Sequence, residues 1–217
     1  MTISYYIYFQ ILSLLLSIYF YKGLKFFNLL GFIPLLAIVC ITEIAAVNAF
    51  KFGWTGNLLI YNIYVIISTP VTMYVFLQML GYKGLTRSIY ICIGALLFIF
   101  TILNFLFVQG WEKFDTYSLI FVEFIIAMLA LLVIARLFQE DDSVILLNKH
   151  PYFWISASTL IFSAVTLIVC GLQQFLLLKK IQLGGVQIYR AIMPAINVFL
   201  YGCYGYAFYL CRKLTNK

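Results

Sequence analysis

Seven apolar stretches, each about twenty residues long, take up most of this sequence. They run over 4–21, 28–50, 58–80, 88–108, 116–138, 152–178 and 186–210. A helix needs roughly 20 apolar residues to cross the hydrocarbon core of a bilayer. The stretches are continuously apolar rather than alternating, which argues against the strands of a membrane β-barrel. We therefore predict an all-α fold: one domain, residues 1–217, forming an integral membrane bundle of seven transmembrane helices.

Composition supports this class of protein. Hydrophobic residues make up 65% of the chain and charged residues 10%, whereas a soluble domain has about 25% charged residues. The net charge of +7 would suggest nucleic-acid binding in a soluble protein. Here the basic residues lie at the ends of the apolar stretches, where they set orientation and contact anionic lipid. The expected partner is thus the lipid bilayer, with no nucleic acid.

The lysines and arginines also predict the orientation. Nine of them follow the first, third, fifth and seventh stretches, and the other five lie on the opposite side. Cytoplasmic loops carry the excess of basic residues in multi-pass proteins. The N-terminus is therefore predicted to lie outside and the C-terminus in the cytoplasm.

Ionisable residues inside the apolar stretches are the main functional clue, because a charge in lipid is costly unless it is paired or hydrated. Glu43 and Glu123 are both expected roughly 10 Å below the outer boundary, at about 1.5 Å of rise per residue, with Arg190 shallower on the same side. Amides and phenols are expected at similar depths, whereas the cytoplasmic halves are expected to hold mostly hydroxyls, such as those of Ser156, Ser158, Thr159 and Ser163. The predicted ligand-binding set is Glu43, Asn48, Tyr61, Asn62, Tyr64, Asn104, Glu123, Arg190 and Asn197.

This set has two interpretations. In the first, the residues line a polar pocket that opens to the outside. In the second, they only hold helices together, with one glutamate paired to Arg190 in a dry core. The first is favoured because two carboxylates outnumber one arginine.

The sequence lacks the motifs of the common catalytic and metal sites. It has one histidine, His150, and no HExxH, so it cannot supply a bis-histidine haem site or a zinc triad. No GxSxG, no Gly-rich phosphate loop and no CxxC pair occurs. We predict no cofactor, no metal site, no catalytic residue and no enzymatic activity.

Several short motifs carry a resemblance to a known group of proteins. They are Pro34 with Thr42-Glu43, Tyr61-Asn62-Ile63-Tyr64, Pro151-Tyr152-Phe153-Trp154-Ile155, and Asn197 with Tyr201 and Tyr204. The chain resembles a group of small, uncharacterised bacterial seven-helix membrane proteins associated with sensor histidine kinase genes. This resemblance implies a multi-pass protein of the bacterial inner (plasma) membrane with a sensory role, and it implies no catalytic residues.

The leading functional hypothesis is a membrane-embedded sensor or signalling accessory protein. It would read a small ligand, a lipid or a proton state in the outward-facing pocket and pass the change to a cytoplasmic or membrane signalling partner. One alternative is a small transporter or proton-coupled carrier that uses the two glutamates. A further alternative is a structural or scaffold subunit whose polar residues only pack helices.

Overall fold

The computed structural model describes residues 5–54, 56–110, 113–140, 144–178, 182–183 and 186–215. The described chain is helical apart from one small hairpin, in which β1 (Gln182–Leu183) pairs antiparallel with β2 (Val186–Gln187). A long helix occupies each of the seven positions predicted from the apolar stretches, so the all-α class is confirmed.

The helix boundaries lie close to those of the apolar stretches. The long helices are α1 (Tyr5–Tyr19), α3 (Phe32–Asn48), α4 (Leu58–Leu80), α5 (Gly84–Leu103), α6 (Thr116–Glu140), α7 (Pro151–Leu178) and α8 (Ile188–Thr215). The short helical segments are α2 (Tyr21–Phe26), η1 (Ala49–Phe52), the π-helical turn η2 (Asn104–Gln109) and η3 (Val144–Lys149).

Five of the described helical segments are long and apolar enough to cross a membrane, judged by length and composition. They are Phe32–Lys51, Leu58–Leu80, Gly84–Gln109, Thr116–Gln139 and Pro151–Leu172. This is the pattern of a multi-pass membrane protein, with five such helices where seven crossings were predicted. Two helices differ for separate reasons: α1 has 15 described residues, and α8 is long but rich in tyrosine, which lowers its hydropathy.

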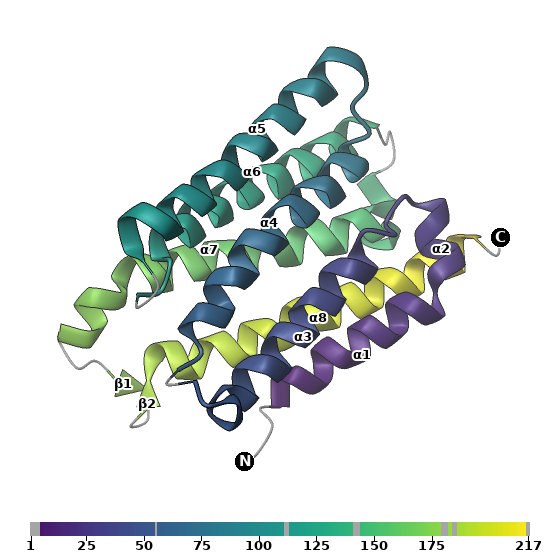
Figure 1. Cartoon of the computed structure of the whole chain (residues 1–217). Helices are drawn as coiled ribbons and strands as arrows, with labels where there is room; N and C mark the ends of the chain where they lie inside the picture. Colours follow the sequence, from purple (N-terminus) through teal and green to yellow (C-terminus); the bar gives the residue numbers. More distant parts are fainter. Residues whose placement is uncertain are drawn as a thin grey trace.

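Six of the long helices form a closed ring, in the order α1, α3, α4, α6, α7, α8 and back to α1. Each helix in this order packs against the next, and α5 lies outside the ring, mainly against α4 (Figure 1). Because α5 has few neighbours, only Leu97 and Thr101 of its side chains are buried. The interior of the ring is therefore built by the other long helices.

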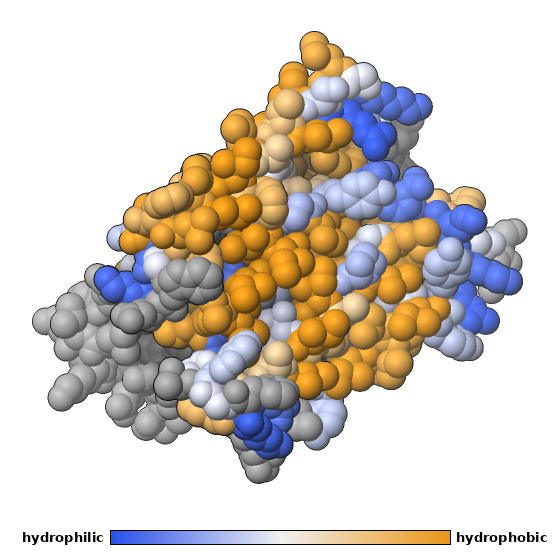
Figure 2. Space-filling view, viewed as in Figure 1, coloured by the Kyte–Doolittle hydropathy of each residue, from blue (hydrophilic) through white to orange (hydrophobic). Residues whose placement is uncertain are grey.

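The surface of the bundle has the distribution expected for a lipid-facing protein. Figure 2 shows a broad hydrophobic band over the helices, with hydrophilic residues gathered toward the ends, including the end where α2 lies. Many large apolar side chains are exposed on this band, such as Leu96 on α5 at 66% and Phe124 on α6 at 52%. Helices that expose apolar side chains in this way are suited to lipid rather than to water.

Aromatic rings fill part of the ring interior near the end where α3 begins. The Phe32 ring lies edge-on to Tyr204 and Phe208 of α8, with centroid distances of 5.1 and 5.6 Å. Phe32 and Phe208 are fully buried. Edge-to-face packing of this kind adds stability beyond the burial of area alone, and it fixes α3 against α8 on one side of the cavity described next.

Candidate functional site

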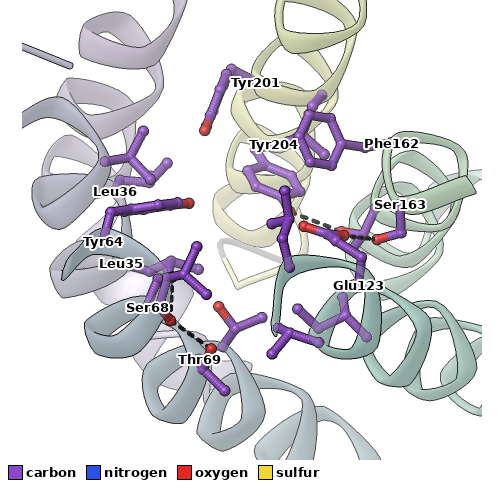
Figure 3. Close-up of a pocket in the computed structure, with 18 residues that line it drawn as sticks. Leu35, Leu36, Tyr64, Ser68, Thr69, Glu123, Phe162, Ser163, Tyr201 and Tyr204 are labelled. Atoms are coloured by element: carbon purple, nitrogen blue, oxygen red, sulfur yellow. Dashed lines mark hydrogen bonds between the residues drawn. The ribbon is translucent and has the colours of Figure 1, made fainter. Parts of the chain in front are cut away.

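The interior of the ring contains a cavity of about 80 Å³, lined by residues of α3, α4, α6, α7 and α8. Its apolar lining includes Leu35, Leu36 and Val39 of α3. Its polar lining consists of one carboxyl group and several hydroxyl groups, from Glu123, Tyr64, Ser68, Thr69, Thr72, Thr159, Ser163, Tyr201 and Tyr204. Figure 3 shows these side chains converging from opposite sides of the ring. The cavity is therefore a hydroxyl-rich chamber with one ionisable acid.

Glu123 is held at this cavity by a neighbouring helix. It lies about two turns into α6, and Ser163 Oγ of α7 donates a hydrogen bond of 2.5 Å to Glu123 Oε2. One turn before Ser163, Thr159 Oγ1 and the Tyr204 hydroxyl of α8 are 2.8 Å apart. Residues four apart share one face of a helix. The same face of α7 thus contacts the acid on α6 through Ser163 and α8 through Thr159. Figure 3 shows Ser163 beside Glu123.

The size of the cavity limits what it can hold. One water molecule takes up about 30 Å³ in the liquid, and pockets for drug-sized ligands measure about 300–1,000 Å³. A cavity of about 80 Å³ fits water molecules or a solute of similar size and excludes a larger ligand. A site lined by hydroxyls and a carboxyl group also offers the several hydrogen-bond partners that an enclosed water needs.

The second glutamate, Glu43 of α3, belongs to a separate cluster. Its Oε2 atom accepts hydrogen bonds from the Tyr6 hydroxyl of α1 at 3.1 Å and from the Tyr61 hydroxyl of α4 at 3.2 Å. Gln10 of α1 is a buried polar neighbour within interaction range of this carboxyl group. These contacts join three helices, as the helix-packing interpretation of Glu43 expects. The Tyr64 phenol lies within electrostatic range of both Glu43 and Glu123.

A third polar cluster ties the start of α6 to α4 and η2. Asn62 of α4 donates from Nδ2 to the carbonyl of Lys113 at 2.9 Å and accepts the backbone N–H of Asp115 at 2.9 Å. Asn104 Nδ2 contacts Asp115 Oδ1 and lies 2.9 Å from Ser118 Oγ. Asp115 Oδ1 also accepts the Ser118 N–H at 3.3 Å, which caps the N-terminus of α6.

Asp115 is fully buried just outside the membrane-spanning part of α6. Burial raises the pKa of its carboxyl group, while hydrogen bonds from Ser118 and Asn104 act in the opposite direction. Its Oδ2 atom has no hydrogen-bond partner among the described residues. The cluster therefore connects the start of α6 to α4 and η2, and within the described residues Asp115 Oδ2 accepts no hydrogen bond.

The structure distributes the predicted ligand-binding residues over these three places. Tyr64 and Glu123 line the cavity, Glu43 and Tyr61 are bonded to each other, and Asn62 and Asn104 meet at Asp115. Asn48 donates to the carbonyl of Ile44 and Asn197 to that of Met193, each within its own helix. The side chain of Arg190 lies outside the described residues. The nine residues thus do not line one common pocket in the described part of the chain.

Sequence reasoning did not select several residues of these clusters, namely Tyr6, Gln10, Asp115, Ser118, Thr159, Ser163 and Tyr204. Asp115 carried a usable signal, because an Asp directly before the start of an apolar stretch is a common N-cap residue. Ser163 and Thr159 were assigned to the cytoplasmic half, away from the acids. α7 is 28 residues long, so Ser163 lies near its middle and reaches Glu123.

In the described part of the chain, no three His, Cys, Asp or Glu side chains come together in a way that could hold a metal ion. Comparison with protein-family models, with curated proteins and with solved structures finds no match to this chain. Its function has therefore to be argued from the geometry of the described residues.

Proposed function

We propose that this chain is a membrane-embedded sensor or signalling accessory protein, in which the protonation or hydration of Glu123 is the state that is read. The observation that carries the proposal is the cavity of about 80 Å³ that holds one carboxyl group among hydroxyl groups of three other helices, α4, α7 and α8. A site of that size suits a proton, water or a similarly small solute. The lipid or larger ligand considered from sequence fits it less well.

The contacts of Glu123 indicate how a change in its protonation would be passed to neighbouring helices. A carboxylate accepts the Ser163 hydrogen bond, whereas a carboxylic acid donates a hydrogen bond of its own. A proton added to Glu123 therefore rearranges its bond to α7. Because Thr159 on the same face of α7 meets Tyr204, that rearrangement is passed to the contact between α7 and α8. A signalling partner would read the new position of these helices.

A proton-coupled carrier is the second candidate, and one observation favours it. The Tyr64 phenol lies within electrostatic range of both glutamates, and Tyr201 lies within range of Glu43 and of Tyr64. Tyr64 lines the cavity that holds Glu123, and a phenol that interacts with two carboxyl groups is a suitable group for passing a proton. A carrier moves protons or substrate across sealed vesicles that contain the purified protein, and a sensor does not, so flux measurements separate the two candidates.

The finer topology is part of the same proposal. We propose that the chain crosses the membrane seven times, through the five long apolar helices together with α1 and α8. We also propose that the N-terminus lies outside. The excess of basic residues on one side supports this orientation. We also propose the bacterial inner membrane as the location, on the resemblance of the short motifs, and a cytoplasmic or membrane protein as the signalling partner.

Infrared spectroscopy of the protein in lipid vesicles tests the proposal. We expect a carboxylic-acid C=O band that changes with pH, is lost in Glu123→Gln and shifts rapidly in heavy water, because the cavity admits water. Glu43→Gln is the matched control and should keep this band, since Glu43 lies in another cluster. A band that Glu123→Gln leaves intact, or a Glu123 band unchanged by pH and by heavy water, contradicts the proposal.

A further inference from the structure

A group of lysines meets at the end of the bundle where α2 packs on α8. Lys22 and Lys25 of α2 are exposed, and between them Gly23 and Leu24 are buried against the bundle. A Cβ placed on Gly23 would lie 2.8 Å from the backbone nitrogen of Arg212. This close approach of two backbones brings the lysines of α2 beside the exposed Lys213 of α8.

Aromatic side chains hold Arg212 in this group. Its guanidinium carbon lies 5.1 Å from the centroid of the Tyr19 ring and 5.6 Å from that of Phe20. A guanidinium that stacks on a ring keeps the N–H groups at its edge available as donors. Tyr19 is 69% exposed and Phe26 is 67% exposed. Exposed aromatic rings beside basic residues are typical of the boundary between lipid tails and headgroups.

The sequence around this group contains no acidic residue. Residues 1–27 and 200–217 have no Asp or Glu, so the lysines of α2 and α8 have no carboxylate neighbour within their own segments. Figure 2 shows hydrophilic residues at this end, directly beside the hydrophobic band. A ligand that matches both features carries an anionic group at the end of an apolar chain.

We propose that α2 and the end of α8 form a binding site for the headgroup of an anionic phospholipid. The ammonium groups of Lys22, Lys25 and Lys213 meet the phosphate, and the acyl chains lie along the exposed apolar surface of α1 and α8. Clusters of lysine and arginine beside an apolar helix attract anionic headgroups in this way. This site is independent of Glu123 and of the proposed sensing function.

Native mass spectrometry of the purified protein in detergent tests the site, with phosphatidylglycerol and phosphatidylcholine of the same acyl chains as probes. We expect the protein to retain phosphatidylglycerol preferentially. The double variant Lys22→Gln/Lys25→Gln should weaken that retention by about tenfold or more, given the usual contribution of each basic residue near a membrane surface. Both lysines are exposed, so the variant should fold normally.

The matched control is Lys83→Gln/Arg87→Gln, which removes two exposed charges, one just before α5 and one in its first turn. It should retain phosphatidylglycerol as the parent protein does. An equal loss in both double variants, or no preference for phosphatidylglycerol in the parent, overturns the proposal. Displacement of the lipid by millimolar inorganic phosphate also overturns it, because the site would then bind a free anion rather than a lipid.

Discussion

Replacing Asn62 by alanine is expected to lower the free energy of unfolding by about 2–4 kcal/mol, the largest loss of stability that we predict from one polar side chain. Asn62 is fully buried, and its amide bonds two backbone groups, the carbonyl of Lys113 and the N–H of Asp115. Losing the buried bond to the Asp115 N–H costs about 1–3 kcal/mol, and losing the part-buried bond to the Lys113 carbonyl adds about 1 kcal/mol. Thermal or denaturant unfolding in detergent, monitored by circular dichroism, measures this loss of stability.

Asn48→Ala is the matched control for this substitution. Asn48 also donates from Nδ2 to a carbonyl, but that carbonyl belongs to Ile44 in the same helix, and the bond is exposed. Its removal should change stability by less than about 0.5 kcal/mol, as is usual for exposed positions. If the two variants unfold alike, Asn62 does not join the start of α6 to α4 in the way described.

Replacing Gly23 by alanine is expected to destabilise the protein by about 1–3 kcal/mol, the usual range for adding a methyl group to a tightly packed site. The new Cβ would lie 2.8 Å from the backbone nitrogen of Arg212 and 2.9 Å from the carbonyl carbon of Cys211. Two backbones cannot yield as a flexible side chain can, so α2 must move away from α8. Unfolding in detergent measures the loss.

Gly202→Ala gives the opposite sign and serves as the control. Gly202 lies inside α8, and a Cβ at this position would meet nothing within 4 Å. Alanine is favoured over glycine in a helix by up to about 1 kcal/mol, so this variant should be slightly more stable than the parent. A stabilising effect of Gly23→Ala as well would mean that α2 does not pack closely on α8.

The helices themselves were predictable, because a continuous apolar stretch of about twenty residues can be recognised without knowing its neighbours. The relative depth of the amides Asn62 and Asn104 was predictable for the same reason, although that of Ser163 was not. Asn62 and Asn104 were placed at similar depths, and in the structure both meet Asp115. Length times rise per residue is sufficient for such an estimate.

The partners of each polar residue were not predictable to the same degree. Apolar residues surround most of each helix, so no periodic pattern marks the face that turns inward. The order of the helices around the ring also cannot be inferred from any single apolar stretch of the sequence. Glu43 therefore faces Tyr6 and Tyr61 rather than Glu123, and Glu123 faces Ser163, a residue assigned to the other half of the membrane.

The most direct test of the central claim uses Trp154 of α7 as a reporter of helix movement. The Trp154 ring lies edge-on to Tyr206 of α8 at 5.1 Å, and its indole N–H donates to the carbonyl of Asn148 at 2.7 Å. A shift of α7 against α8 changes the contact of Trp154 with Tyr206. The sequence contains three tryptophans. Replacing Trp54 and Trp111 by phenylalanine leaves Trp154 as the only source of tryptophan fluorescence.

The fluorescence of Trp154 should then be followed from acidic to alkaline pH in this background, with Glu123→Gln and with Glu43→Gln. His150 lies close in sequence to Trp154, and its contribution persists in all three proteins. Beyond this common contribution, we predict one pH-dependent transition that Glu123→Gln removes and Glu43→Gln retains. Identical titration curves with and without Glu123 would contradict the claim that its protonation moves α7 against α8.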